Sequence, residues 1–157
     1  MGGFEKQKEY LEKLLTGLSK ITGSGVEKKK KSEKEEPVKK GTPLEQANGL
    51  YKSKKYSEAK IKYAAIVDER TSAKDKAQIL HNLGMCDFHS KNFEEAVAWF
   101  SRLYTDFPKS PFNKTGLYHL SKSLKILKKY DEAKQTAEEL SNQYPDSVEA
   151  KELFKKN

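Results

Sequence analysis

Hydrophobic and small residues recur along this chain with one fixed period. An aromatic residue, two polar residues and an alanine occur at Tyr56–Ala59, at Phe93–Ala96 and at Tyr130–Ala133, so each step is 37 residues long. The same step relates small residues and prolines at other positions: Ala47, Gly84 and Ser121, and Pro108 and Pro145. Agreement among several kinds of position on one period indicates three structural repeats within residues 44–157.

Each repeat reads as a pair of antiparallel helices. In the second repeat we predict a first helix over Ala77–Ser90, a turn at Lys91 and Asn92, and a second helix over Phe93–Asp106 that ends before Pro108. The small residues of the first helix and the alanines of the second allow the two helices to approach closely. The aromatic residue that starts each second helix is expected to fill the gap at the turn. Further core residues stand at helical spacing: Leu83, Phe100, Leu103, Leu120 and Leu140.

The predicted fold is therefore all-α, an α-solenoid of three antiparallel helix pairs. We place the repeats at about 44–71, 72–108 and 109–145, followed by a C-terminal helix over 146–157. A composition of 35% hydrophobic and 34% charged residues agrees with an elongated stack, in which each unit buries only a thin apolar layer.

A different pattern occupies the start of the chain. Phe4, Leu11 and Leu18 recur every seven residues, with Leu14 and Ile21 three further on, which predicts a short amphipathic, coiled-coil-like helix within residues 1–22. A helix of this length is marginal by itself, so we expect it to bind another copy of itself, the repeats, or a second protein. Residues 23–43, rich in lysine, glutamate and glycine, are interpreted as a charged flexible linker.

The net charge of +8 raises the question of an anionic partner. Acidic residues are interspersed with the lysines nearly everywhere, which favours a solvated surface and disfavours nucleic acid, and we expect at most peripheral contact with a membrane. The lysine run 28–31 keeps electrostatic binding of nucleic acid or anionic lipid as an alternative. The sequence has no apolar run long enough to span a bilayer and no signal-peptide layout at Met1. We therefore expect a cytoplasmic protein, or a periplasmic one if a signal peptide has been removed.

Chemically reactive side chains gather only on the first helix of the second repeat. His81, Met85 and His89 stand at i, i+4 and i+8, which puts them on one helix face beside Cys86. Two histidines and a thioether are a poor set of ligands, so we expect neither metal nor cofactor. The single cysteine is interpreted as a small packing residue. The sequence has no phosphate-binding loop, paired carboxylate motif or catalytic triad pattern, and we predict a protein that is not an enzyme.

The spacing of the second repeat resembles the tetratricopeptide repeat signature through Leu83-Gly84, Phe93, Ala96, Phe100 and Pro108. The third repeat is similar at Leu120, Tyr130, Ala133, Leu140 and Pro145, although Ser121 replaces the glycine. The 37-residue period, with proline and serine between units, is similar to a subgroup of bacterial envelope proteins. That subgroup includes the Tol-Pal-associated cell-division coordinator and outer-membrane assembly lipoproteins. In the coordinator family an oligomerising coiled coil precedes a flexible linker and the repeats, which implies homo-oligomerisation through residues 4–21 here.

The fold implies a binding surface, because the first helices of stacked pairs line the concave face of such a solenoid. The outward positions of these helices are our predicted partner-binding residues: Asn48, Tyr51, Lys52, His81, Asn82, Met85, Phe88, His89, Tyr118, His119, Lys122 and Lys125. This mixture of aromatic, amide and basic groups suits an extended or helical peptide with some negative charge, and Asn82 is expected to hydrogen-bond its backbone.

Asn48 and Asn82 also correspond to the two asparagines of a carboxylate clamp in chaperone-binding repeats. Leu44, Thr115 and His119 replace the basic members of that clamp, so we retain only a general groove. The predicted function is a protein–protein interaction adaptor or scaffold. The alternatives within the same fold are an oligomeric structural subunit of an envelope complex and a structural subunit whose groove is filled by its own N-terminal helix.

Overall fold

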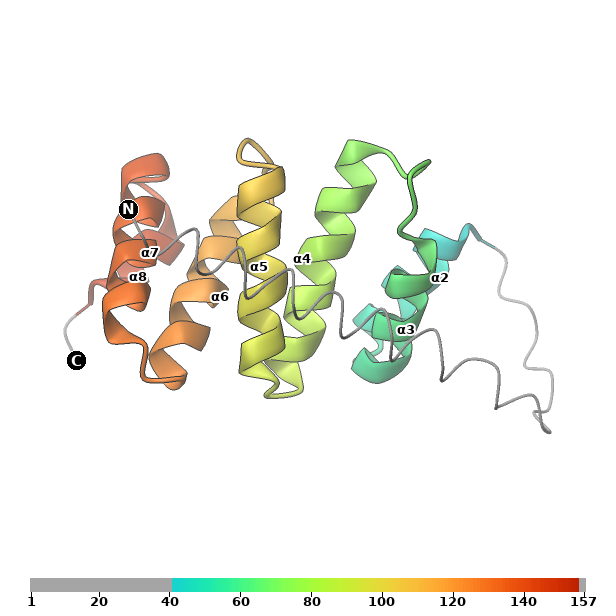
Figure 1. Ribbon diagram of the computed structural model, residues 1–157, viewed down its shortest axis with the longest axis horizontal. Helices are drawn as coiled ribbons and strands as arrows, with labels where there is room; N and C mark the ends of the chain where they lie inside the picture. The colour runs from blue at the N-terminus through green and yellow to red at the C-terminus, as the bar shows by residue number, and fades with distance from the viewer. Residues whose placement is uncertain (1–40, 156–157) are drawn as a thin grey trace.

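A computed structural model of the protein describes residues 41–155. This part of the chain contains helices and no strand, and the helices stand side by side in one row (Figure 1). Successive antiparallel pairs α2/α3, α4/α5 and α6/α7 form the row, and α8 packs against α6 and α7 at its end. The bounds are α2 Pro43–Lys52, α3 Tyr56–Ile66, α4 Ala73–His89, α5 Phe93–Asp106, α6 Asn113–Ile126, α7 Tyr130–Gln143 and α8 Val148–Leu153. The predicted all-α solenoid of three helix pairs is confirmed, while the predicted helix within 1–22 and nearly all of the predicted linker lie outside the described residues.

The first helices of the first two pairs begin at polar caps. Thr42 and Glu45 form a capping box at the start of α2, in which each side chain accepts a hydrogen bond from the other residue's backbone N–H. Ser72 caps α4 by accepting from the backbone N–H of Asp75 at 3.1 Å. This cap corrects our prediction that the helix starts at Ala77, since the capped helix begins four residues earlier, at Ala73.

The turn inside each pair is built in the same way three times. Lys54, Lys91 and Lys128, each 37 residues from the next, have φ angles of 60°, 62° and 62° and are the only non-glycine residues in the left-handed region among those described. In the second pair the Lys91 N–H donates to the carbonyl of Phe88 at 3.1 Å, and the Asn92 N–H donates to that of Asp87 at 2.8 Å. This is a Schellman motif, which satisfies the last carbonyls of the first helix and reverses the chain. The predicted turn at Lys91 and Asn92 is confirmed.

Small residues hold the two helices of a pair close together, as predicted. A methyl group added at Gly84 on α4 would lie 2.6 Å from Cε1 of Phe100 on α5. Ser121 on α6 approaches α7 closely enough for its hydroxyl to donate to the backbone carbonyl of Ala133 at 2.8 Å. The predicted leucines and Phe100 are all buried, which confirms them as core residues.

One of the three aromatic residues at the turns differs from our prediction. Tyr56 and Phe93 are half-buried, whereas Tyr130 at the start of α7 is 60% exposed. Phe93 packs edge-to-face on Phe88, with ring centroids 5.5 Å apart. The residue 37 positions after Phe88 is the exposed Lys125, which offers Tyr130 no ring to pack against.

Candidate functional site

The predicted partner-binding residues lie on the first helices α2, α4 and α6, but the structure separates them by burial. Asn82, Met85 and Tyr118 are only 8%, 7% and 9% exposed, because helices of neighbouring pairs cover them. Lys52 and Lys125 are exposed. His89 is exposed as well. The remaining six are half-buried: Asn48, Tyr51, His81, Phe88, His119 and Lys122. Several of these six take part in one cluster of rings.

The two asparagines belong to a polar cluster inside the molecule. The Tyr63 hydroxyl on α3 donates to Asn48 Oδ1 at 2.6 Å, and Asn82 Nδ2 donates to the same hydroxyl at 3.0 Å. Asn82 Oδ1 lies 3.1 Å from Nδ1 of His81. Burial raises the pKa of Tyr63 to about 12 and lowers that of His81 below its ordinary value. Since the amide of Asn82 already bonds within the chain at both ends, a bond to a peptide backbone would have to replace one of these contacts.

A continuous strip of rings crosses the first-helix side of the stack. We call Tyr51, Tyr56, Phe88, His89 and His119 the aromatic patch. Tyr51 packs edge-to-face on Tyr56 at 5.8 Å between ring centroids, and Tyr56 stacks on His89 at 4.8 Å with only 15° between the planes. Phe88 contacts His89 at 6.0 Å and His119 at 4.8 Å. The patch therefore joins all three repeats through contacts between rings, and each of its members retains solvent exposure.

The charge on the patch comes from a lysine rather than from the histidines. Burial lowers the pKa of both His89 and His119, and the positive charge of a nearby lysine lowers it further in each case. Lys122 lies over two rings, with Nζ 5.0 Å from the centroid of Tyr118 and 5.9 Å from that of Phe88. Near neutral pH the patch thus presents neutral rings beside an ammonium group, which suits apolar and acidic side chains of a ligand.

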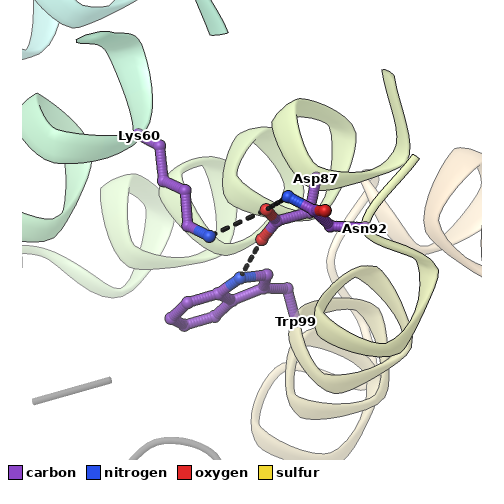
Figure 2. A network of polar contacts seen from close by, with 4 residues as sticks. All are labelled: Lys60, Asp87, Asn92 and Trp99. Atoms are coloured by element: carbon purple, nitrogen blue, oxygen red, sulfur yellow. Dashed lines mark hydrogen bonds and ion pairs between the residues drawn. The ribbon is translucent and has the colours of Figure 1, made fainter. Parts of the chain in front are cut away.

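A buried carboxylate fixes the helices on which the patch stands (Figure 2). Asp87 on α4 is 1% exposed and accepts from Lys60 Nζ on α3 at 2.8 Å and from Trp99 Nε1 on α5 at 2.8 Å. Asn92 Nδ2 adds a longer bond at 3.4 Å. Asp87 directly precedes Phe88, so this network holds the patch in register with both the preceding pair and its own partner helix. The only indication of this network in the sequence is an acidic residue in the otherwise apolar stretch Met85-Cys86-Asp87-Phe88.

Two kinds of reactive group are relevant to chemistry in residues 41–155, namely metal-binding clusters and the thiol of Cys86. No three His, Cys, Asp or Glu side chains in this range are placed to hold a metal ion. Cys86 is buried, and burial raises its pKa to about 12, so the thiol stays protonated and packs as an apolar group. None of the helices in this range combines the length and the apolar character needed to cross a membrane.

Sequence reasoning missed one member of the patch and one further surface. From the sequence we assigned Tyr56 only to the turn of the first repeat. Because Tyr56 starts the second helix of that repeat, it also lies close to the end of the first helix. The second surface lies at the end of the stack, where Ile126, Tyr130, Val148 and Phe154 are each at least 50% exposed. Lys125, predicted as part of the groove, belongs to this end of the molecule.

Comparison with known proteins supports the class that this geometry indicates. The tetratricopeptide repeat family matches residues 116–147, which contain most of α6, all of α7 and the cap of α8. No curated protein matches the chain. The match and the packing of the helix pairs support a tetratricopeptide repeat protein. Such repeats generally mediate protein–protein interactions and act as scaffolds, which suggests an adaptor role.

Proposed function

We propose that this protein is an adaptor that binds a peptide or helix of a partner protein across the aromatic patch. The observation that carries the proposal is the position of Phe88. It is half-buried, it contacts His89, Phe93 and His119, and it lies under the ammonium group of Lys122. Aromatic side chains are enriched at protein–protein interfaces, where they supply many of the binding hot spots.

The arrangement of the patch also supports a ligand that crosses several repeats. Its contacts run from Tyr51 on α2, through Phe88 and His89 on α4, to His119 on α6. A patch of this kind anchors apolar side chains at intervals along an extended or helical segment. The ammonium group of Lys122 favours an acidic residue near the anchors.

Selection from a random peptide library on the immobilised full chain tests the proposal. We expect enriched peptides with aromatic or aliphatic anchors and acidic neighbours. Phe88→Ala should weaken their binding by at least about tenfold, which is the size of a moderate hot spot. Ile61→Ala is the matched control, because Ile61 is a 63% exposed hydrophobic residue that is not a member of the patch. Equal binding by both variants, or no enrichment at all, would rule the proposal out.

We also propose a relation to the envelope subgroup and an oligomer formed through residues 4–21. The 37-residue period and the Pro-Lys-Ser and Pro-Asp-Ser links support the first, and the heptad of Phe4, Leu11 and Leu18 supports the second. Analytical ultracentrifugation of the full chain tests the oligomer. We expect Leu11→Asp to convert it to a monomer without loss of helical repeats, and a wild-type chain that is already monomeric at high concentration would refute it.

A further inference from the structure

Beyond the aromatic patch, the C-terminal end of the stack has a groove of about 870 Å³ between α6, α7 and α8. Of the six large hydrophobic side chains that the described residues expose, four line this groove: Ile126, Tyr130, Val148 and Phe154. Concentration of exposed apolar groups at one place marks a surface that binds another molecule. We call this surface the end groove.

The 37-residue register explains why the groove is open. Within the stack α6 packs on α5, where Phe93 is half-buried and Phe100 is buried. The residues equivalent to these two on α7 are Tyr130 and Ala137. The helix equivalent to α6 is α8, but it has 6 residues where α6 has 14.

Because α8 starts at the C-terminal end of α7 and runs back along it, this short helix leaves the first half of α7 uncovered. Tyr130 is exposed as a result, whereas Leu140 is buried. Within residues 41–155 the groove is thus the part of this helix position that α8 leaves unfilled.

The charged residues around the groove indicate which kind of ligand it binds. Among the lining residues, five are lysines and one is an acid, Glu152. That acid accepts a hydrogen bond from the Tyr118 hydroxyl at 2.7 Å, so it is held by the protein itself. The lysines stand around the apolar floor on the three helices and just after α8: Lys122, Lys125, Lys134, Lys151 and Lys155.

The chain's own amphipathic segment does not complement this rim. Residues 4–21 contain four lysines and three glutamates, a net charge of +1. We propose that the end groove binds an amphipathic helix of a partner protein whose apolar face is flanked by acidic residues. Its apolar face would lie on Tyr130, Ala137 and Phe154, and its acids would face the lysine rim.

Binding of synthetic peptides to the full chain, followed by fluorescence anisotropy, tests this inference. The probe is a helical peptide of about four turns with leucines along one face and glutamates on both flanks. The first comparison peptide has lysines in place of the glutamates, and the second has the sequence of residues 4–21. We expect the acidic peptide to bind at least tenfold more tightly than either, with affinity that falls as salt rises.

Variants of the groove locate the bound peptide. Lys134→Glu combined with Lys151→Glu should weaken binding by about tenfold, because two attractions become repulsions. Tyr130→Ser should weaken binding because it removes apolar contact with the peptide. Since Tyr130 is 60% exposed, weaker binding by this variant would not be due to loss of the fold. Lys109→Glu, an exposed change of the same charge outside the groove, should leave binding unchanged.

Three results would overturn the inference. One is tighter binding of the 4–21 peptide, which would make the groove a site for the chain's own segment. Another is equal affinity in the groove variants and in Lys109→Glu. The third is loss of binding in Phe88→Ala alone, which would move the peptide to the aromatic patch. Since Phe88 does not line the end groove, failure here and failure of the proposed function are separate outcomes.

Discussion

The substitution Gly84→Ala adds a single methyl group and thereby tests how closely the two helices of the second pair are packed. Replacing glycine by alanine in a helix interior normally stabilises a protein by about 1 kcal/mol. At Gly84 the added Cβ would lie 2.6, 2.7 and 2.8 Å from three atoms of the Phe100 ring. Carbon atoms prefer separations of roughly 3.5–4.0 Å, so the ring would have to move by about 1 Å.

Whether Gly84→Ala stabilises or destabilises the protein depends on how freely the Phe100 ring can move. The ring is 1% exposed and packs in a buried cluster with residues of α6 and α7. Overpacking of such a core costs about 1–3 kcal/mol, which exceeds the gain in helix propensity. After subtraction of the propensity gain of about 1 kcal/mol, we expect Gly84→Ala to lower the free energy of unfolding by up to about 2 kcal/mol.

Gly49 on α2 is the matched control for this substitution. A Cβ added there meets nothing within 4 Å, so only the propensity term acts and Gly49→Ala should stabilise by about 1 kcal/mol. Urea unfolding of the full chain, followed by far-ultraviolet circular dichroism, measures both changes. Phe100→Leu should be less harmful in the Gly84→Ala background than in the wild type, because the smaller side chain makes room for the methyl group. Stabilisation by Gly84→Ala equal to that by Gly49→Ala would refute the close-packing argument.

Three further predictions concern the buried carboxylate, the turns and the histidines. Asp87→Ala should lower the free energy of unfolding by about 2–3 kcal/mol, because it leaves the Trp99 indole N–H buried without an acceptor, whereas Lys60, at 26% exposure, can be hydrated when unpaired. Lys60→Met should also be destabilising, because it removes the cation from the Asp87 carboxylate, which is 1% exposed. Lys91→Gly should stabilise by about 1 kcal/mol in the same urea assay, because relief of the left-handed conformation outweighs the added entropy of the unfolded chain; a loss of stability would contradict this. Burial holds the pKa of His81 below 6.5, so the folded state favours the neutral ring and stability should fall as the pH drops below 6.5 through the folded pKa. His81→Gln should reduce the slope of that part of the stability profile, to which His89 and His119 also contribute because their pKa values are lowered as well, and an unchanged profile would contradict the assignment.

The helix pairs themselves were predictable because the interactions that define them are short in sequence. The repeated aromatic-x-x-alanine motif locates α3, α5 and α7, and Pro108 marks the end of α5. The start of α4 was missed because apolar periodicity locates the buried part of a helix, whereas its true start is set by the side chain of Ser72.

The exposure of the residues that form the proposed binding surface was predictable only in part. The periodicity correctly placed Tyr51, Phe88 and His89 at outward positions of the first helices. In the structure these residues are exposed or half-buried. It also assigned Asn82 and Tyr118 to the open face, where the structure buries them. Whether a residue at such a position is covered depends on how far each pair rotates relative to the next, and the pattern within one pair contains no information about that rotation.

The sequence by itself thus determined the number of helix pairs, the residues that hold each pair together and the fold class. The tertiary structure decided how the pairs are stacked, through contacts such as Lys60 with Asp87 and Tyr118 with Glu152, which join residues 27 and 34 positions apart. It also decided that rings from three repeats form one patch and that α7 keeps an open face beside α8. The physical reason is that pairing within a repeat follows from local period and size, whereas exposure depends on the neighbouring repeat.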